Sequence, residues 1–313
     1  MSKMLINESP LFLDGWLEFN RRKWNLEPRI IKFKEDHKQI PFLKTVLYYD
    51  KKGFITIPPR NPYLPVEFRS TPTQSSSRVG RQWLVLSGML SDELYRAGVR
   101  GTIPFSPNVT DLRMFQWRGF HVQVRYTFYL HLPIDKRQID HAVRKQIKKA
   151  GNNAFTCSRV VSPEEIMQCL TDTEDRNGFS YGLSVSDIKM AQELLSEEHF
   201  RCYGCYAPNG EIASARIILH RAGSRAIDWV AGTKRKFLNS GATQGLIAFA
   251  LDDLASAGAT GFDFAGANIP NVAAAKATWG GRLVPFYIVS APSLRGILKY
   301  AFDIRKYHSS VRR

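Results

Sequence analysis

The order of strand and helix patterns in the second half of the chain restricts its fold more than any other sequence feature. Two strand patterns are joined by Pro208-Asn209-Gly210, whose Asn-Gly pair favours a tight hairpin. A third strand, an amphipathic helix and two short strands follow. In chain order, the first three strands are 201–207, 212–220 and 227–230, the helix is 243–257, and the last two strands are 261–264 and 283–289. Helix patterns precede them. This order predicts a mixed sheet with helices packed against it and excludes a doubly wound parallel sheet.

The length of the chain predicts two lobes. It has 313 residues, whereas one domain usually has roughly 100–200. We place the boundary near Pro133-Ile134-Asp135, which gives an N-terminal lobe at 1–134 and a C-terminal lobe at 135–313. A helix at 293–313 is expected to pack back on the first lobe. In that lobe we predict strands at 44–49, 53–57 and 120–132, a helix at 83–97 and a mobile polar loop at 70–78.

Composition permits a buried core and predicts a polyanionic partner. Apolar residues make up 44% of the chain and charged residues 23%, which excludes global disorder. Lys and Arg total 44 against 28 Asp and Glu, a net charge of +16. This excess favours contact with nucleic acid, a phosphate-rich substrate or, peripherally, an anionic membrane surface.

Other classes of protein are excluded by simple patterns. No apolar run reaches the ~18 residues of a membrane-spanning helix, and the first residues do not resemble a secretory signal. The 4 cysteines are too few for a disulfide scaffold, so we expect a reducing, cytoplasmic setting. Cys202-Tyr203-Gly204-Cys205 is half of a zinc motif without a second half, and no metal is predicted.

Basic residues gather in short clusters. The predicted helix at 135–150 carries six basic and two acidic residues and ends at Gly151. Such a face is either a solvated surface or a contact for phosphates. The clusters are Lys136-Arg137, Arg144-Lys145, Lys148-Lys149, Lys234-Arg235-Lys236, Arg305-Lys306 and Arg312-Arg313.

A loop of small residues before the helix at 243–257 is a candidate anion site. Backbone N–H groups at a helix N-terminus suit a phosphate or a polarised carbonyl, although most such loops are ordinary caps. The candidate residues for binding the anionic or carbonyl group of a substrate, here called the donor, are Lys236, Asn239, Ser240, Gly241, Ala242 and Thr243.

The stretch that follows resembles a known family. Phe262-Asp263-Phe264-Ala265-Gly266 is a short strand ending in small residues, and Lys276 stands four residues before Gly280-Gly281 and a strand that runs into Pro285-Phe286-Tyr287. The order and spacing of these motifs resemble those of the FemAB-like branch of the GNAT acyltransferase superfamily. The basic segment at 144–151 and the segment at 111–120 resemble further parts of that family, so the likeness covers the chain from about residue 50.

The resemblance implies a fold and a reaction. The expected fold is α/β (α+β), with two GNAT-like lobes, each a mixed and mostly antiparallel sheet flanked by helices, facing across a cleft. The expected activity is N-(amino)acyl transfer from aminoacyl-tRNA to an amine on a peptidoglycan precursor, peptide or related metabolite, with amide bond formation and no cofactor.

The resemblance also implies site residues. Lys276 matches the family lysine that steadies the oxyanion, and a surface lysine is the alternative. Asp263 either orients or deprotonates the amine or is a buried structural aspartate. Trp279 keeps an aromatic position of the family and is assigned to donor binding, whereas Ala275 replaces another aromatic residue and indicates an altered acyl pocket.

The donor has an alternative. Acyl-CoA-dependent GNAT enzymes usually have Arg or Gln where this chain has Lys236, and glycine where it has Asn239. These departures favour charged tRNA as the donor. The alternative is an N-acyltransferase that uses a coenzyme A thioester as co-substrate and acts on a sugar nucleotide or metabolite.

Two further expectations remain. Arg60, Arg69 and Arg113 are candidates for binding the acceptor, and a surface or loop arginine is the alternative for each. A non-catalytic module that binds nucleic acid or an anionic surface is the alternative outside the enzymes.

Overall fold

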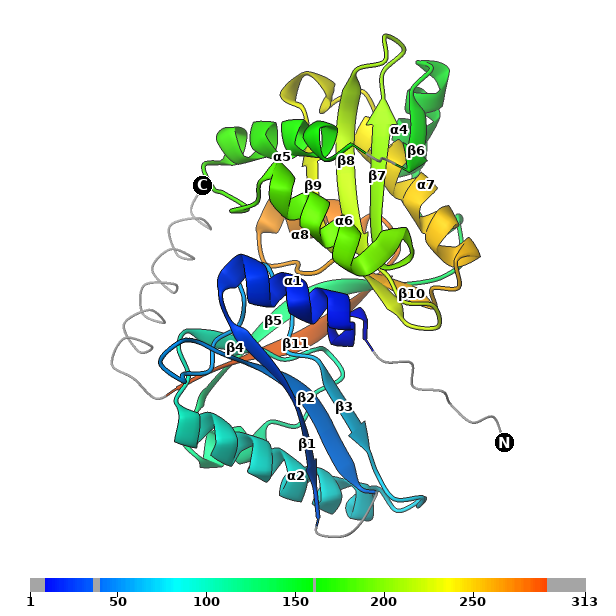
Figure 1. Cartoon of the computed structure of the whole chain (residues 1–313). Helices are drawn as coiled ribbons and strands as arrows, with labels where there is room; N and C mark the ends of the chain where they lie inside the picture. Colours follow the sequence, from blue (N-terminus) through cyan, green and yellow to red (C-terminus); the bar gives the residue numbers. More distant parts are fainter. Residues whose placement is uncertain (1–8, 36–39, 160–161, 292–313) are drawn as a thin grey trace, which may run out of the picture. The chain divides into compact units, whose positions relative to one another are not determined.

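The computed structural model describes residues 9–35, 40–159 and 162–291 (Figure 1). Two compact units divide the chain, one of Met1–Lys23 and Arg125–Pro285 and the other of Trp24–Val124 and Phe286–Arg313. The predicted boundary at 134/135 lies inside the first unit, because the strand before it pairs with a later strand of that unit, Gly261 opposite His131. The predicted helix at 293–313 lies outside the described residues.

A mixed sheet forms the centre of the first unit, as predicted. Its strands follow the order β5-β10-β9-β8-β7-β6. Only β9 and β10 are parallel neighbours; the β10–β5, β9–β8, β8–β7 and β7–β6 pairs are antiparallel. The strands are β5 (His121–His131), β6 (Thr156–Arg159), β7 (Phe200–Tyr206), β8 (Ile212–Leu219), β9 (Arg225–Thr233), β10 (Gly261–Asp263) and β11 (Arg282–Ser290), the last of which continues into the second unit.

Helices cover both faces of this sheet (Figure 1). On β7, Cys202 accepts a hydrogen bond from Gln192 of α6, whereas the hydroxyl of its neighbour Tyr203 donates to Asp253 of α7. Because neighbouring residues of a strand point to opposite faces, α6 and α7 cover opposite faces. The helices are α1 (Asp14–Trp24), α4 (His141–Asn152), α5 (Pro163–Asn177), α6 (Val185–His199), α7 (Ala242–Ser256) and α8 (Pro270–Ala277), with a short 3-10 helix η2 (Arg235–Phe237).

Helix α1 is fixed to the first unit by an aromatic cluster. Trp16 and Phe19, one turn apart on α1, are fully buried. Both meet the ring of Trp229 edge-on, with centroids 5.3 and 5.7 Å away, and Phe200 packs against the same indole. No element was predicted here from the sequence. The burial of both rings explains why the segment is helical.

The second unit holds a three-stranded antiparallel sheet and a long helix. The strands pair in the order β1-β2-β3, and Glu27 lies opposite Tyr49. Leu86, Leu90 and Leu94 form the buried stripe of α2. The elements are β1 (Glu27–Lys34), β2 (Phe42–Tyr49), β3 (Val66–Arg69), α2 (Ser76–Ala97), β4 (Thr102–Pro104) and α3 (Arg113–Trp117), and β4 pairs with the end of β11.

Two predictions in this unit were wrong. Helix α2 begins at Ser76, inside the segment predicted to be a mobile loop, because the Ser75 hydroxyl accepts the Arg78 amide as an N-cap. The predicted strand at 53–57 is not one: Ile55 makes only isolated bridges, to Tyr49 and Val99.

In the first unit, helix α4 starts later than predicted. Asp140 accepts the Ala142 amide at 2.7 Å, so the residues from 135 to 140 precede the helix. Within the described ranges, none of the helices combines the length and apolar content that a membrane span requires.

We predict that Trp16→Ala destabilises the first unit by about 3–5 kcal/mol, because a fully buried indole is replaced by a cavity. The free energy of unfolding in urea measures this effect. Trp117→Ala, which truncates a residue that is 65% exposed, is the control and should change stability by less than about 0.5 kcal/mol. Equal effects of the two substitutions would contradict the packing of α1.

Candidate active site at the parting of two parallel strands

Strands β9 and β10 run side by side and then separate. Their pairing ends with Asp263 opposite Ile227, and β9 continues to Thr233 against β8 alone. The chain beyond β10 turns to the other neighbour, since the amide of Phe264 donates to the carbonyl of Phe128 on β5. The carboxyl ends of parallel strands that part in this way are a common place for a binding site.

Lys276 projects from the last turn of α8 toward the end of β10. Its Nζ donates to the carbonyls of Phe264 and Gly266, both at 2.6 Å. An ammonium group has three N–H donors, so these carbonyls leave one for a bound oxygen atom. Lys276 is therefore held in one direction by the backbone and is half-buried, unlike a solvated surface lysine.

The loop that holds Lys276 is itself held by Asp263 and Thr127. Asp263 is 2% exposed, and its Oδ1 accepts the Thr127 hydroxyl at 2.6 Å and the Ala265 amide at 2.8 Å. Thr127 in turn accepts the Gly266 amide at 3.0 Å. Ala265 has φ +50° and Gly266 φ +108°, a left-handed turn that costs energy at the alanine. These bonds stabilise the turn whose carbonyls point at Lys276.

A buried ion pair lies near Lys276. Arg216 of β8 bonds Asp228 of β9, and both side chains are 9% exposed. Burial lowers the pKa of Lys276 below its ordinary value, and the negative charge of Asp228 is the largest influence that opposes this shift. Arg216 adds to the lowering, and Asp263 opposes it more weakly. The four side chains therefore form one electrostatic cluster.

A bulge in β9 makes the ion pair possible. Val230 lies opposite Ile217 and Asp228 lies opposite Ile218, so Trp229 is an extra residue. Without it, Asp228 would be on the face of the sheet opposite to that of Arg216, because side chains alternate along a strand. This pair was not predicted from the sequence, although two charged residues inside apolar strand patterns were a usable signal.

The predicted donor loop is packed against α4. Gly241 and Ala242 are buried, and the amide of Ala242 donates to Ser240 Oγ at 3.1 Å. Lys149 of α4 donates to the carbonyl of Asn239 at 2.7 Å. A Cβ on Gly241 would lie 2.2 Å from the carbonyl oxygen of Gln146. The small residues thus serve helix packing, and their predicted contact with a donor stays a prediction.

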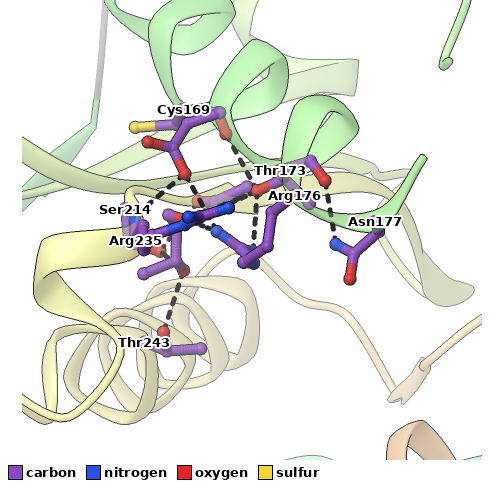
Figure 2. A network of polar contacts seen from close by, with 10 residues as sticks. Cys169, Thr173, Arg176, Asn177, Ser214, Arg235 and Thr243 are labelled. Carbon is purple, nitrogen blue, oxygen red and sulfur yellow. Dashed lines mark hydrogen bonds and ion pairs between the residues drawn. The ribbon is translucent and has the colours of Figure 1, made fainter. Parts of the chain in front are cut away.

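Figure 2 shows the polar network that joins the end of β9 to α5 and α7. The Thr233 hydroxyl lies 2.9 Å from that of Thr243 at the start of α7. The backbone of Thr233 donates to Thr173 and accepts from Arg176, so this end of the strand is bound by side chains of α5. Thr243, predicted to bind a donor, thus connects α7 to β9.

The other two predicted donor residues have different surroundings. Lys236 is exposed and forms an ion pair with Glu211 at 2.6 Å. Trp279 is 3% exposed, belongs to the core of the first unit and lines a groove of about 440 Å³ between α4 and α7.

The three predicted acceptor arginines lie in the second unit, and Lys276 lies in the first. Arg69 pairs with Glu67 at 3.1 Å, Arg113 pairs with Asp111 at 2.7 Å, and Arg60 is exposed with φ +67°. Asp111, with Phe68, lines a cavity of about 510 Å³ in the second unit that the sequence analysis did not foresee. A common acceptor site stays a prediction.

The cysteines are buried or half-buried. Burial raises the pKa of Cys202 to about 12, which disfavours the thiolate that a metal would need. Among the described residues, no group of three or more His, Cys, Asp or Glu side chains is placed to hold a metal ion.

Comparison with solved structures confirms the predicted α/β fold class. The crystal structure of FemX superposes with a TM-score of 0.65 at 13% identity, over 90% of this chain and 92% of FemX. The C-terminal domain of a putative lysylphosphatidylglycerol synthetase from Agrobacterium fabrum gives 0.58 at 12% identity, over 94% and 91% of the two chains. L-PGS from Bacillus licheniformis gives 0.54 at 13% identity, over 93% and 96%.

The chain has the fold of these proteins. No protein-family model and no curated protein sequence matches it. At such low identity the likeness is one of fold, and the reaction has to be argued from the site.

We predict that Gly241→Ala destabilises the protein by about 1–3 kcal/mol, because the alanine meets α4 and has to adopt a positive φ. Urea unfolding measures the change. Gly151→Ala is the matched control: its Cβ meets nothing within 4 Å, and the helix propensity of alanine predicts an unchanged or slightly higher stability. A neutral Gly241→Ala would leave an anion-binding role as the better explanation of this glycine.

Proposed function

We propose that this protein is a FemAB-like N-(amino)acyltransferase that moves an aminoacyl group from aminoacyl-tRNA to an amine, forming an amide. The carrying observation is Lys276, whose ammonium is fixed by two carbonyls where β9 and β10 part. A positive group held in one direction can stabilise charge that appears during a reaction, because it does not have to reorganise.

The reaction needs a nucleophile and a group that stabilises the oxyanion of the intermediate. The acceptor amine attacks the ester carbonyl carbon, and the carbonyl oxygen becomes negative. The third N–H of Lys276 donates to that oxygen. As the intermediate collapses, the new C–N bond stays, the ester C–O bond breaks, and the proton lost by the nitrogen ends on the departing ribose hydroxyl. No covalent enzyme intermediate is required.

In this proposal Asp263 is a positioning residue. Its Oδ1 already accepts two hydrogen bonds that hold the turn from Phe264 to Gly266. The side chain is 2% exposed and Oδ1 is engaged by the turn, so Asp263 is given no proton-transfer role here. Removal of the amine proton is therefore left to water or to a group on the acceptor.

The donor loop favours a tRNA ester over a thioester. A pyrophosphate at the N-terminus of α7 would compete with Ser240 for the first amide and would meet α4 beside Gly241. A tRNA instead needs an exposed basic surface. Arg144, Lys145 and Lys148 of α4 are exposed and supply one, in line with the net charge of +16.

We predict that Lys276→Ala lowers the rate of transfer by about 10²–10³-fold, the cost of removing one oxyanion donor. Steady-state transfer of radiolabelled aminoacyl groups measures it, and circular dichroism checks the fold. Lys51→Ala, at an exposed lysine in the turn after β2, is the control and should keep the wild-type rate. An unchanged rate for Lys276→Ala would remove this lysine from the mechanism.

The donor is tested by incubating the protein with mixed aminoacyl-tRNAs and acyl-CoAs and identifying by mass spectrometry which is consumed. We expect consumption of aminoacyl-tRNA, with an affinity for tRNA that falls steeply and log-linearly with salt concentration. Consumption of acyl-CoA alone, with a flat salt response for tRNA, would replace the proposal by its thioester alternative. If neither donor is bound or consumed, the non-catalytic binding module becomes the favoured alternative.

A further inference from the structure

In the described part of the chain, the buried ion pair between Arg216 and Asp228 leaves one polar atom of each side chain without a hydrogen-bond partner. Each side chain is 9% exposed. Among the described residues, Arg216 Nε and Asp228 Oδ1 have no hydrogen-bond partner. A buried polar atom without a partner destabilises a protein, and more so when it is charged. A buried ion pair is weak evidence for stability, so this arrangement is better explained by a ligand.

The strand register places the pair at the candidate active site. Asp228 follows Ile227, the last residue of β9 that pairs with β10, and Asp263 lies opposite that residue. Lys276 is bonded to the carbonyls that come directly after β10. Asp228 thus lies where the pairing of β9 with β10 ends, and the ammonium group of Lys276 is held by the turn that follows β10.

The free atoms have complementary chemistry. Asp228 Oδ1 accepts a hydrogen bond from a cation, while Lys276 donates one to an oxygen. An aminoacyl ester carries an α-ammonium group one carbon away from its carbonyl. A plain acyl thioester has no donor at that position and would leave the carboxylate unpaired.

We propose that Asp228 binds the α-ammonium group of the aminoacyl donor and that Arg216 fixes the carboxylate for this contact. The inference rests on the proposed function and deepens it: the site selects donors with a free amino group next to the carbonyl. Such selection is strong, because a rejected analogue leaves a buried charge without a partner.

The test measures binding to three forms of one tRNA pool: uncharged, charged with mixed L-amino acids, and charged and then Nα-acetylated. We expect the full-length protein to bind the acetylated pool about 10–100-fold more weakly than the free-amine pool, the range for a hydrogen bond to a charged group. In Asp228→Asn this ratio should fall to nearly one, while affinity for uncharged tRNA stays unchanged.

Asp252→Asn is the matched control. Asp252 is an exposed aspartate on α7 that pairs with Lys136, and its substitution should keep the wild-type ratio. Equal binding of free-amine and acetylated pools by the wild-type protein would overturn the inference and leave the proposed function standing. Failure to bind any tRNA form would overturn both. If Asp228→Asn does not fold, the wild-type comparison still decides.

Discussion

The hydrogen bonds from the Lys276 ammonium to the carbonyls of Phe264 and Gly266 are the interaction on which the site depends. They hold only because the turn after β10 keeps its shape. That shape includes a left-handed alanine, Ala265, and is maintained by Asp263 and Thr127. A strained turn is thus stabilised by buried hydrogen bonds, and the direction of the lysine follows from it. Pre-organisation of this kind is what the proposed role of Lys276 in stabilising an oxyanion requires.

The charges around Lys276 have opposing effects on its pKa. Burial disfavours its ammonium form, and Asp228 and Asp263 oppose that effect. Asp228 forms its ion pair with Arg216 and not with Lys276. The two cations and two carboxylates of this cluster are complementary in charge to a ligand that carries both a positive and a partly negative group. An aminoacyl ester is such a ligand.

The small-residue loop before α7 illustrates how one sequence pattern can serve two physical ends. Small residues at a helix start suit a phosphate, but they also let another helix approach. Gly241 meets the backbone of α4 at a distance that excludes any side chain. Thr243 binds Thr233 of β9 (Figure 2). Packing therefore accounts for both residues, whereas the exposed cations of α4 remain available to a polyanion.

Local patterns were enough to predict much of the fold. The β7–β8 hairpin follows from Asn209-Gly210, and α7 follows from its apolar stripe. Helix α1 was missed because its stability comes from contacts of Trp16 and Phe19 with Trp229, far away in the sequence. The start of α2 was misplaced because a serine-rich segment is equally typical of a loop and of a helix cap, and only the hydrogen bond of Ser75 decides between them.

By itself, the sequence determined the mixed sheet, the resemblance to acyltransferases and the candidacy of Lys276 and Asp263, because these depend on short-range periodicity and on motif order. Tertiary structure alone decided what surrounds the lysine. The bulge at Trp229 moves Asp228 to the face of Arg216, and the pairing of β9 with β10 ends directly before Asp228. Such contacts depend on strand register, which pairs residues far apart in the chain and leaves no local pattern in the sequence.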